Sequence, residues 1–289
     1  MRKNNGFLIV AFFLLIFPLQ LSAKDLIITF IDVGQGDSIL VETPSGRNIL
    51  IDGGGTPAWR QRTYNIGNMR IAPVLRKKQI KVLDKVILTH GHADHVEGLL
   101  DIIGLYPVRE VIDTREGGGG ADDEYVKFLE LVKEKKIRYR VVKEGDALEL
   151  DPDLAVGVLN PPGKFSYNNA NDNSLVLQLV YRQFQVLLAA DIGQAAERRL
   201  VGKYGAALRS RVLKIAHHGS KTSSCASFLD AVKPELAVIS CGRNNTFGHP
   251  HPDVIKRLKR LKIQYLNTAY QGSITVTSNG ENFQVGTEY

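Results

Sequence analysis

The sequence feature that most constrains the fold is residues 85–98, which read KVILTHGHADHVEG. Residues 86–88 form an apolar run that is typical of a short buried strand. Residues 99–103 are again apolar and suited to a helix, so the segment between the two runs predicts a strand-to-helix turn, where functional residues collect in open α/β sheets. Small residues separate four potential metal ligands in this turn: His90, His92, Asp94 and His95.

The ligand types and their spacing favour a hydrolytic metal centre. Neutral imidazole and carboxylate bind Zn²⁺, Mn²⁺ and Fe, and a catalytic site keeps one position open for water. Two ions about 3.5–4 Å apart can hold a hydroxide and contact both the attacking and the leaving oxygen. The pattern His-x-His-x-Asp-His offers one pair of ligands to each ion. The alternative, a solvated polar turn or buried histidines without metal, requires this spacing to arise by accident.

The rest of the chain predicts an α/β protein whose strands and helices fall into two broadly similar halves. Alternating and β-branched residues indicate strands at residues 26–33, 38–42, 48–51, 108–112, 139–142, 154–159, 175–181, 185–190, 212–216, 236–240, 265–268, 273–277 and 283–285. Apolar residues at helical spacing indicate helices at residues 66–79, 121–136, 195–204, 228–232 and 254–261, the first with a kink or late start at Pro73. Because Asp52, His90, Asp191 and His217 each end a strand, we expect them to meet at one rim.

The motif THGHADH resembles the signature of the metallo-β-lactamase fold hydrolases. Together with four further segments it resembles the hydrolase domain of the ComEC competence proteins across nearly the whole mature chain. This resemblance implies a four-layer αββα sandwich, the metallo-β-lactamase fold, in which helices flank two mixed sheets. The four segments are residues 30–54 (FIDVGQGDSILVETPSGRNILIDGG), 171–179 (NDNSLVLQL), 213–224 (LKIAHHGSKTSS) and 244–254 (NNTFGHPHPDV).

The resemblance also implies roles for the ligands around two divalent metal ions. His90 and His92 match the ligands of the first ion, and Asp94 and His95 match those of the second. Asp191 follows an apolar strand and matches the carboxylate that bridges both ions, although a lone aspartate at a strand end is usually only a cap.

Two adjacent histidines compete for the last ligand position of the second ion. His217 follows the predicted strand 212–216 and matches that ligand. Neighbours along an extended chain point to opposite faces, so we expect one ligand, His217, with His218 supporting the ligands or contacting substrate. The next residues offer the Gly219 N–H and the Ser220 hydroxyl to a phosphate oxygen.

One departure from the family pattern affects the first ion. Many relatives carry a further histidine ligand between the main motif and the bridging aspartate, and this sequence has no histidine from 96 to 216. Asp172 lies in that region and is our candidate replacement, with Asn171 and Asn173 as weaker ones. An oxygen donor shifts the preference from the default Zn²⁺ toward Mn²⁺, and a mononuclear site stays open as an alternative.

Three further residues have proposed roles near the reaction. His249 lies between glycine and proline in a rigid turn and is suited to protonate a leaving group or hold a phosphate oxygen, whereas His251 fits better as a helix start. Asp52 is suited to accept hydrogen bonds from N–H groups of the metal ligands and so hold them in place. The alternative is that it only forms a turn. In the mechanism that we expect, metal-bound hydroxide attacks phosphorus, Asp94 or Asp191 orients it, and Ser220 or His249 offsets charge on the phosphate oxygens.

Residues 1–23 are typical of a signal peptide. Arg2 and Lys3 form a positive start, residues 6–19 are apolar, and Leu-Ser-Ala at the end resembles a cleavage site. We therefore expect residues 24–289 to be an exported hydrolase domain, periplasmic or extracellular, with an uncleaved N-terminal anchor as the alternative. Export would permit a disulfide between the two cysteines, Cys225 and Cys241, and the sequence leaves their pairing open.

Charge and resemblance together suggest the substrate. The formal net charge is +7, and loss of Arg2 and Lys3 with the signal peptide would leave +5, which favours anionic partners such as nucleic acid, cell-wall phosphate polymers or phospholipid. We expect a phosphodiesterase that acts as a nuclease on DNA. The alternatives are a phosphoester hydrolase on cell-wall or lipid head-group substrates, a β-lactamase, and a nucleic-acid-binding module without turnover.

Overall fold

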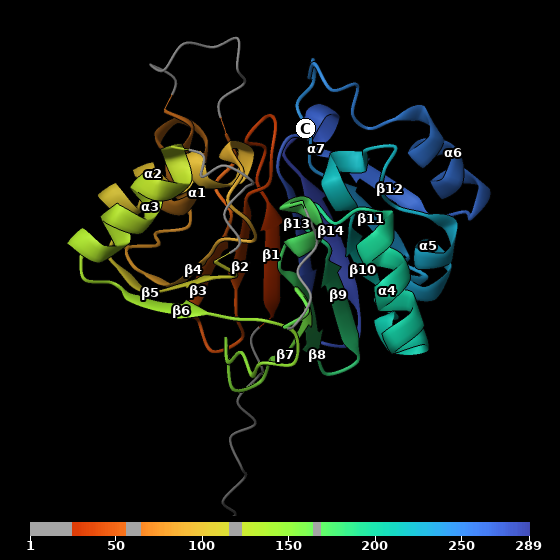
Figure 1. The fold of residues 1–289 in the computed structure, drawn as a ribbon, viewed down its shortest axis with the longest axis horizontal. Coiled ribbons are helices and arrows are strands. Elements are labelled where there is room, and N and C mark those ends of the chain that lie inside the picture. The colour runs from red at the N-terminus through yellow and green to blue at the C-terminus, as the bar shows by residue number, and fades with distance from the viewer. Residues whose placement is uncertain (1–24, 56–64, 116–122, 164–168) are drawn as a thin grey trace, which may run out of the picture.

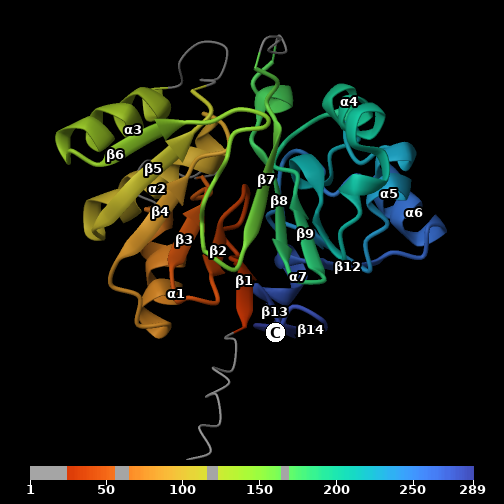
Figure 2. The same cartoon turned by 90° about the horizontal axis from the view of Figure 1, so that it is seen from below.

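The computed structural model describes residues 25–55, 65–115, 123–163 and 169–289. Two mixed sheets pack face to face, and helices cover the outer side of each, as Figures 1 and 2 show from perpendicular directions. This is the four-layer αββα sandwich that the resemblance implied. The signal-peptide prediction for residues 1–23 lies outside the described residues. Within the described residues, no helix has both the length and the apolar character needed to cross a bilayer.

The first sheet carries the histidine motif and is completed by the last two strands of the chain. Its order is β14-β13-β1-β2-β3-β4-β5-β6, antiparallel from β14 to β3 and parallel from β3 to β6. Its strands are β1 (Leu26–Phe30), β2 (Ile39–Glu42), β3 (Asn48–Ile51), β4 (Leu83–Ile87), β5 (Val108–Asp113), β6 (Arg138–Val141), β13 (Ile274–Ser278) and β14 (Phe283–Thr287).

The second sheet is built from the second half of the chain. Its order is β12-β11-β10-β9-β8-β7, with β9 to β12 parallel and β7 to β9 antiparallel. Its strands are β7 (Ala155–Asn160), β8 (Val176–Tyr181), β9 (Phe184–Leu188), β10 (Val212–Lys214), β11 (Leu236–Ile239) and β12 (Gln264–Asn267).

The helices lie on the outer faces, and apolar residues fill three layers between the elements. The middle layer joins both sheets through residues such as Phe30 and Phe184. The outer layers pack residues such as Phe128 and Phe228 under the helices of each half. The first sheet is covered by α1 (Ala72–Lys77), α2 (Ala93–Leu105) and α3 (Asp123–Glu134), and the second by α4 (Gln194–Tyr204), α5 (Ala226–Val232) and α6 (Pro252–Arg260), while α7 (Thr268–Gln271) follows β12.

Three local differences from the sequence prediction matter for the site. Helix α2 begins at Ala93 rather than after Gly98, so Asp94 and His95 lie in its first turn. The predicted helix 66–79 is a π-helical turn followed by α1, and Pro73 lies in the first turn of α1, where proline is tolerated. Both cysteines are buried free thiols, so the pairing left open by the sequence is absent.

Candidate metal centre

The ends of β3, β4, β9 and β10 bring their polar residues to one rim of the sandwich. Asp52 follows β3, His90 follows β4, Asp191 follows β9, and the two adjacent histidines follow β10. The four strands lie in two different sheets, yet a chain of short contacts links their ends through His95: its ring is 4.2 Å from that of His90, and its nitrogens lie 2.8 Å from Asp52 and 3.3 Å from Asp191. The predicted convergence of strand ends is therefore present.

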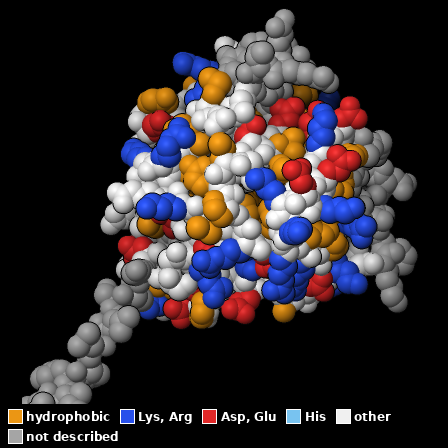
Figure 3. Space-filling model, turned by 90° about the vertical axis from the view of Figure 1, so that its left-hand side faces the viewer, with side chains coloured by type: hydrophobic (Ala, Val, Ile, Leu, Met, Phe, Trp, Pro, Cys, Tyr) orange, Lys and Arg blue, Asp and Glu red, His pale blue; other side chains and the backbone are white. Residues whose placement is uncertain are grey.

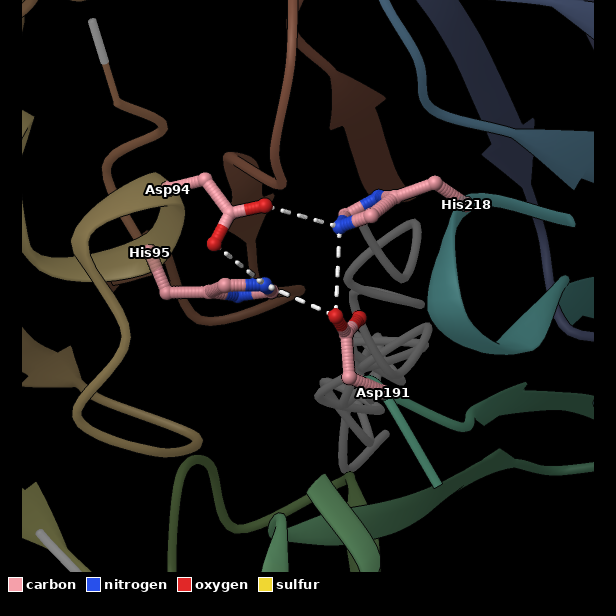
Figure 4. A group of neighbouring side chains, drawn as sticks. All are labelled: Asp94, His95, Asp191 and His218. Carbon is pink, nitrogen blue, oxygen red and sulfur yellow. Dashed lines mark ion pairs between the residues drawn. The ribbon is translucent and has the colours of Figure 1, made fainter. Parts of the chain in front are cut away.

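Four side chains at this rim form a compact group of potential ligands. One ligand atom from each lies within 4.8 Å of all the others: Asp94, His95, Asp191 and His218. Figure 4 shows two imidazoles and two carboxylates that point toward one another from α2, from the end of β9 and from the segment after β10. Asp191 Oδ2 is 3.3 Å from His95 Nε2 and 3.2 Å from His218 Nε2. The remaining carboxylate, Asp94 Oδ2, lies 3.3 Å from His218 Nε2.

The contacts of the two Nδ1 atoms determine which nitrogen of each imidazole faces the group. His218 Nδ1 lies 2.9 Å from the Ser240 carbonyl oxygen, which can only accept, so Nδ1 carries the proton. His95 Nδ1 lies 2.8 Å from Asp52 Oδ2 and is held in the same way. When neutral, each ring would therefore turn the lone pair of its Nε2 inward, toward carboxylate oxygens.

This arrangement requires positive charge among the four side chains. In the described part of the chain, the buried Nε2 atoms of His95 and His218 have no hydrogen-bond partner. Burial opposes a charged His95, but the carboxylates of Asp191 and Asp52 outweigh it, so the pKa of His95 lies well above its usual range. A metal ion bound by two imidazole nitrogens and two carboxylates supplies that charge in place of protons, and the donor set suits Zn²⁺, Mn²⁺ or Fe. The residues present thus fit a divalent metal ion.

The structure places His218, not His217, in this group, whereas the sequence favoured His217. The prediction assumed an extended chain, but both residues have left-handed backbone angles, with φ of 49° and 54°. The chain therefore curls after β10, and His218 is buried against the carboxylates. His217 lies beside the group, with its Nε2 3.9 Å from Asp191 Oδ2, and remains partly exposed.

His90 and His92 lie next to the group and face each other. Their Nε2 and Nδ1 atoms are 3.0 Å apart, and the His90 ring lies 4.2 Å from that of His95. Burial holds the pKa of His90 well below its usual range, so its imidazole is neutral and able to act as a ligand. The pair is thus positioned for a first ion beside the four-residue group.

Asp172 does not take the place of the missing histidine in this structure. In the part of the chain that the structure describes, it belongs to neither compact group of potential ligands. Its Oδ1 accepts a hydrogen bond of 2.7 Å from the Gly193 N–H, and its Oδ2 accepts one of 3.0 Å from Asn169. Asp172 therefore holds the loop that follows Asp191.

The two remaining candidates lie at the edge of the site. The Ser220 hydroxyl is 2.9 Å from that of Thr222. The His249 ring lies 5.7 Å from that of His217 and 6.2 Å from that of His218. Burial and the neighbouring His218 and His217 lower the pKa of His249 to about 4, so the ring is neutral at pH 7 and is better suited to holding a phosphate oxygen than to acting as a charged acid.

Asp52 has the bracing position that the sequence suggested. Its Oδ1 accepts from the Thr89 N–H at 2.8 Å, and its Oδ2 accepts from the Thr89 hydroxyl at 2.7 Å and contacts His95 Nδ1 at 2.8 Å. It therefore fixes both the residue before His90 and the ring of His95. Such partners orient metal-binding histidines and raise their basicity.

Sequence reasoning missed a buried ion pair that joins the two halves at this site. Lys214, the last residue of β10, is fully buried, and its Nζ contacts Asp37 and donates to the Ala190 carbonyl at 3.0 Å. Nζ also lies 3.7 Å from Asp191 Oδ1. Burial works against a charged lysine, but Asp37 and Asp191 raise the pKa of Lys214, so it stays protonated. A lysine inside the apolar run VLKIA was the available signal.

The approach of Asp37 depends on the preceding glycine. Gly36 has a φ of +104°, and a Cβ there would lie 1.9 Å from the Asp94 carbonyl oxygen. Only glycine lets this loop lie against the first turn of α2. Asp37 Oδ1 then reaches to 3.5 Å from His218 Nδ1.

An αββα sandwich with a His/Asp cluster at the shared rim of its sheets defines a class of metal-dependent hydrolases. The chain belongs to the metallo-beta-lactamase superfamily, whose profile matches residues 31–243. The solved structure of CmlA, a diiron beta-hydroxylase from Streptomyces venezuelae, has the same fold, with a TM-score of 0.52, 13% identity, and coverage of 88% of this chain and 54% of that chain.

Two curated relatives narrow the resemblance. The chain is 34% identical over 275 residues to ComE operon protein 3 of Bacillus subtilis (strain 168), covering 92% of this chain and 34% of that protein. It is 30% identical over 269 residues to Competence protein ComA of Neisseria gonorrhoeae, covering 92% of this chain and 34% of that protein. The chain thus spans about a third of the length of these relatives. They are ComEC-like competence proteins, so the resemblance seen in the sequence is confirmed.

Proposed function

We propose that this protein is an exported metal-dependent phosphodiesterase that hydrolyses DNA. The observation that carries the proposal is the rim cluster, in which two buried imidazole Nε2 atoms without a hydrogen-bond partner among the described residues face two carboxylates. The name of one relative, Competence protein ComA, supports DNA as the substrate because it refers to competence. The charge of +7 and the signal-like residues 1–23 support an anionic substrate and export.

The residues divide into three groups by what they would do. His90 and His92 would hold one ion, Asp94, His95 and His218 a second, and Asp191 both. When bound, two divalent ions, Zn²⁺ or Mn²⁺, lower the pKa of water toward ~7 and stabilise negative charge on the phosphate.

Groups around the metal ions would orient the ligands, the attacking water and the phosphate. Asp52 and the Ser240 carbonyl keep protons on the Nδ1 atoms of His95 and His218, so both Nε2 lone pairs stay directed inward. The inward carboxylates, Asp94 and Asp191, are placed to orient the attacking water. The neutral His249 ring, at the edge of the site, is placed to hold a non-bridging phosphate oxygen.

The test is a substrate panel with Mn²⁺ and Zn²⁺ that compares the wild type with Asp191→Ala. We expect metal-dependent cleavage of DNA and of bis-p-nitrophenyl phosphate, and loss of both in Asp191→Ala. The exposed Asp230→Ala on α5 is the matched control and keeps wild-type rates.

Three outcomes would overturn this function. Preferential turnover of phosphorylcholine esters would indicate a head-group or cell-wall esterase, and turnover of nitrocefin would indicate a β-lactamase. Salt-sensitive DNA retention without cleavage in any metal would indicate a binding module.

A further inference from the structure

A cavity of about 590 Å³ opens beside the metal centre on the second half of the molecule. It is lined by the turn before α6, by α6 itself, by the edge strand β12 and by α7. We call it the α6–α7 groove and define it by five of its lining residues: Lys256, Lys259, Tyr265, Tyr270 and His249.

The groove begins at the metal centre because His249 belongs to both. Its ring lies 6.2 Å from that of His218 and stacks at 5.6 Å on that of Phe247. The segment around it is seated on the loop after β10, since the His251 N–H donates to the Gly219 carbonyl at 2.8 Å. A chain lying in the groove therefore reaches the ligand cluster at one end.

The groove is basic. Lys256 and Lys259 project from α6 and are exposed, and Asp253 on the same helix forms an exposed ion pair of 3.8 Å with Lys256 Nζ. Arg243 adds a third cation, with its guanidinium 6.0 Å from the centre of the Tyr270 ring. In contrast, the face of the molecule over the first half mixes basic and acidic side chains (Figure 3). The groove thus suits a chain of negative charges.

Exposed aromatic rings accompany these cations. Phe247 is 64% exposed and Tyr270 is 62% exposed, although soluble proteins usually cover such rings. Aromatic faces beside a basic groove are the elements with which proteins bind single-stranded nucleic acid, because bases stack on the rings while cations follow the backbone. Bases in a duplex are already stacked on one another, so these rings favour an unpaired strand.

We propose that the α6–α7 groove binds single-stranded nucleic acid and directs its backbone into the metal centre. This inference rests on the proposed phosphodiesterase function and adds the form of its substrate. Lys256 and Lys259 contact phosphates, Tyr270 stacks on a base within the groove, and Phe247 stacks on a base next to His249.

The first experiment measures phosphate contacts. Binding of the full chain to a fluorescein-labelled phosphorothioate oligothymidylate, which resists cleavage, is followed by anisotropy at several salt concentrations. For a single strand, the slope of log K against log[salt] changes by about 0.7 for each phosphate contact. We expect Lys256→Ala/Lys259→Ala to reduce the slope by about 1.4. The matched control, Lys77→Ala/Lys81→Ala, removes the same charge from exposed positions in the first half and leaves the slope unchanged.

The second experiment measures stacking in the same assay. Stacking of one base on an aromatic ring contributes enough that its removal weakens binding by about tenfold or more. We expect this loss in Tyr270→Ala and in Phe247→Ala, and we expect Tyr270→Phe to bind like the wild type because it keeps the ring. Thermal melting of each variant verifies that it is folded.

Several results would overturn the groove assignment. These are an unchanged slope in the double lysine variant, equal affinity for a duplex of the same length, or capture of anionic phosphatidylglycerol vesicles without oligonucleotide binding. The two proposals fail separately. Oligonucleotide binding that depends on the groove, without hydrolysis of any phosphodiester by the wild type, would refute only the catalytic function. Hydrolysis without groove dependence would refute only the groove.

Discussion

The two halves of the molecule supply the metal centre in different ways. The first half offers its ligands within one short segment, where β4 ends and α2 begins, so four of them lie within six residues: His90, His92, Asp94 and His95. The second half offers Asp191 and His218 singly, each after a different strand. The first contribution is set by local sequence, and the second depends on how the sheets are packed.

The second half also requires more unusual backbone geometry. Ala190, His217 and His218 all have positive φ, between 46° and 54°, directly beside the ligands. Such angles are sparsely populated by non-glycine residues and persist only where the surrounding structure holds them. The buried pair between Lys214 and Asp37 provides such support, since Nζ of the lysine also holds the Ala190 carbonyl. The comparison therefore predicts that the metal centre is more sensitive to substitutions in the second half than to substitutions in the first.

The largest expected effect separates the two adjacent histidines. His218→Ala removes a ligand and should lower kcat for bis-p-nitrophenyl phosphate on the order of a thousandfold, with loss of bound metal. His217→Ala removes only a neighbour of the site and should cost roughly tenfold, with metal content retained. Elemental analysis of metal per chain measures the difference. Equal metal loss in both variants would restore His217 as a ligand.

The next effect concerns the ion pair between the halves. Lys214→Met leaves the Asp37 carboxylate buried without its cation and should lower the free energy of unfolding by about 3–5 kcal/mol. Adding Asp37→Asn removes that charge, so the double variant should regain part of the loss. Urea denaturation measures the free energy of unfolding of the single and the double variant. If Lys214→Met were as stable as the wild type, the pair would not hold the halves together.

A smaller effect should follow from substituting Asp172, which holds the loop after Asp191. Asp172→Ala removes the acceptor for the Gly193 N–H and should lower kcat by roughly ten- to a hundredfold, as loss of partners around metal ligands does. Asp172→Asn keeps an oxygen in this position and should stay near the wild-type rate. Steady-state kinetics with unchanged metal content would identify a positioning role, whereas loss of one metal ion in Asp172→Ala would make it a ligand after all.

The smallest effect concerns a surface link between the halves. Glu144 precedes β7 and accepts hydrogen bonds of 3.0 Å from Arg199 and 2.5 Å from Tyr204, both on α4. Burial raises its pKa, but these donors and Lys203 outweigh burial, so the pKa of Glu144 lies below its ordinary value of 4.5.

Because the folded state lowers this pKa, the stabilisation is present above pH 4.5 and is lost as the pH falls below that value. Glu144→Gln should therefore lower stability by about 1 kcal/mol at pH 7, and the difference should disappear in acid. Thermal melting of both proteins at pH 7 and in acid measures this difference in stability. Glu149→Gln, at a 75% exposed side chain, is the control and should change nothing at either pH.

Much of this structure could be predicted from the sequence, for reasons that differ between residues. Strands such as β3, at Asn48–Ile51, follow from a short apolar run after a turn, and the histidine motif identifies one side of the site. The packing of two sheets into a sandwich came from family resemblance, and the order of the strands was not predicted. Alternation shows that strands exist, but it does not show which ones pair.

The differences between the sequence prediction and the structure share a physical cause. The choice between His217 and His218 depended on whether the chain stays extended after β10, and left-handed angles there carry no glycine signal. Asp172 was assigned by its place in the sequence, whereas its role depends on the nearby Gly193 N–H. The pair of Asp37 and Lys214 joins segments far apart in the chain, so the lysine in the run VLKIA could indicate a buried cation but not its partner.

That buried pair also makes the first half depend on a segment that is synthesised later. During synthesis the histidine motif leaves the ribosome well before Asp191, Lys214 and His218, and until then Asp37 lacks its cation. The first sheet is also completed late, because β13 pairs with β1 and β14 pairs with β13. A nascent chain thus carries the recognisable motif before the complete ligand group, which requires residues 191–218, and before the complete first sheet, which requires β13 and β14.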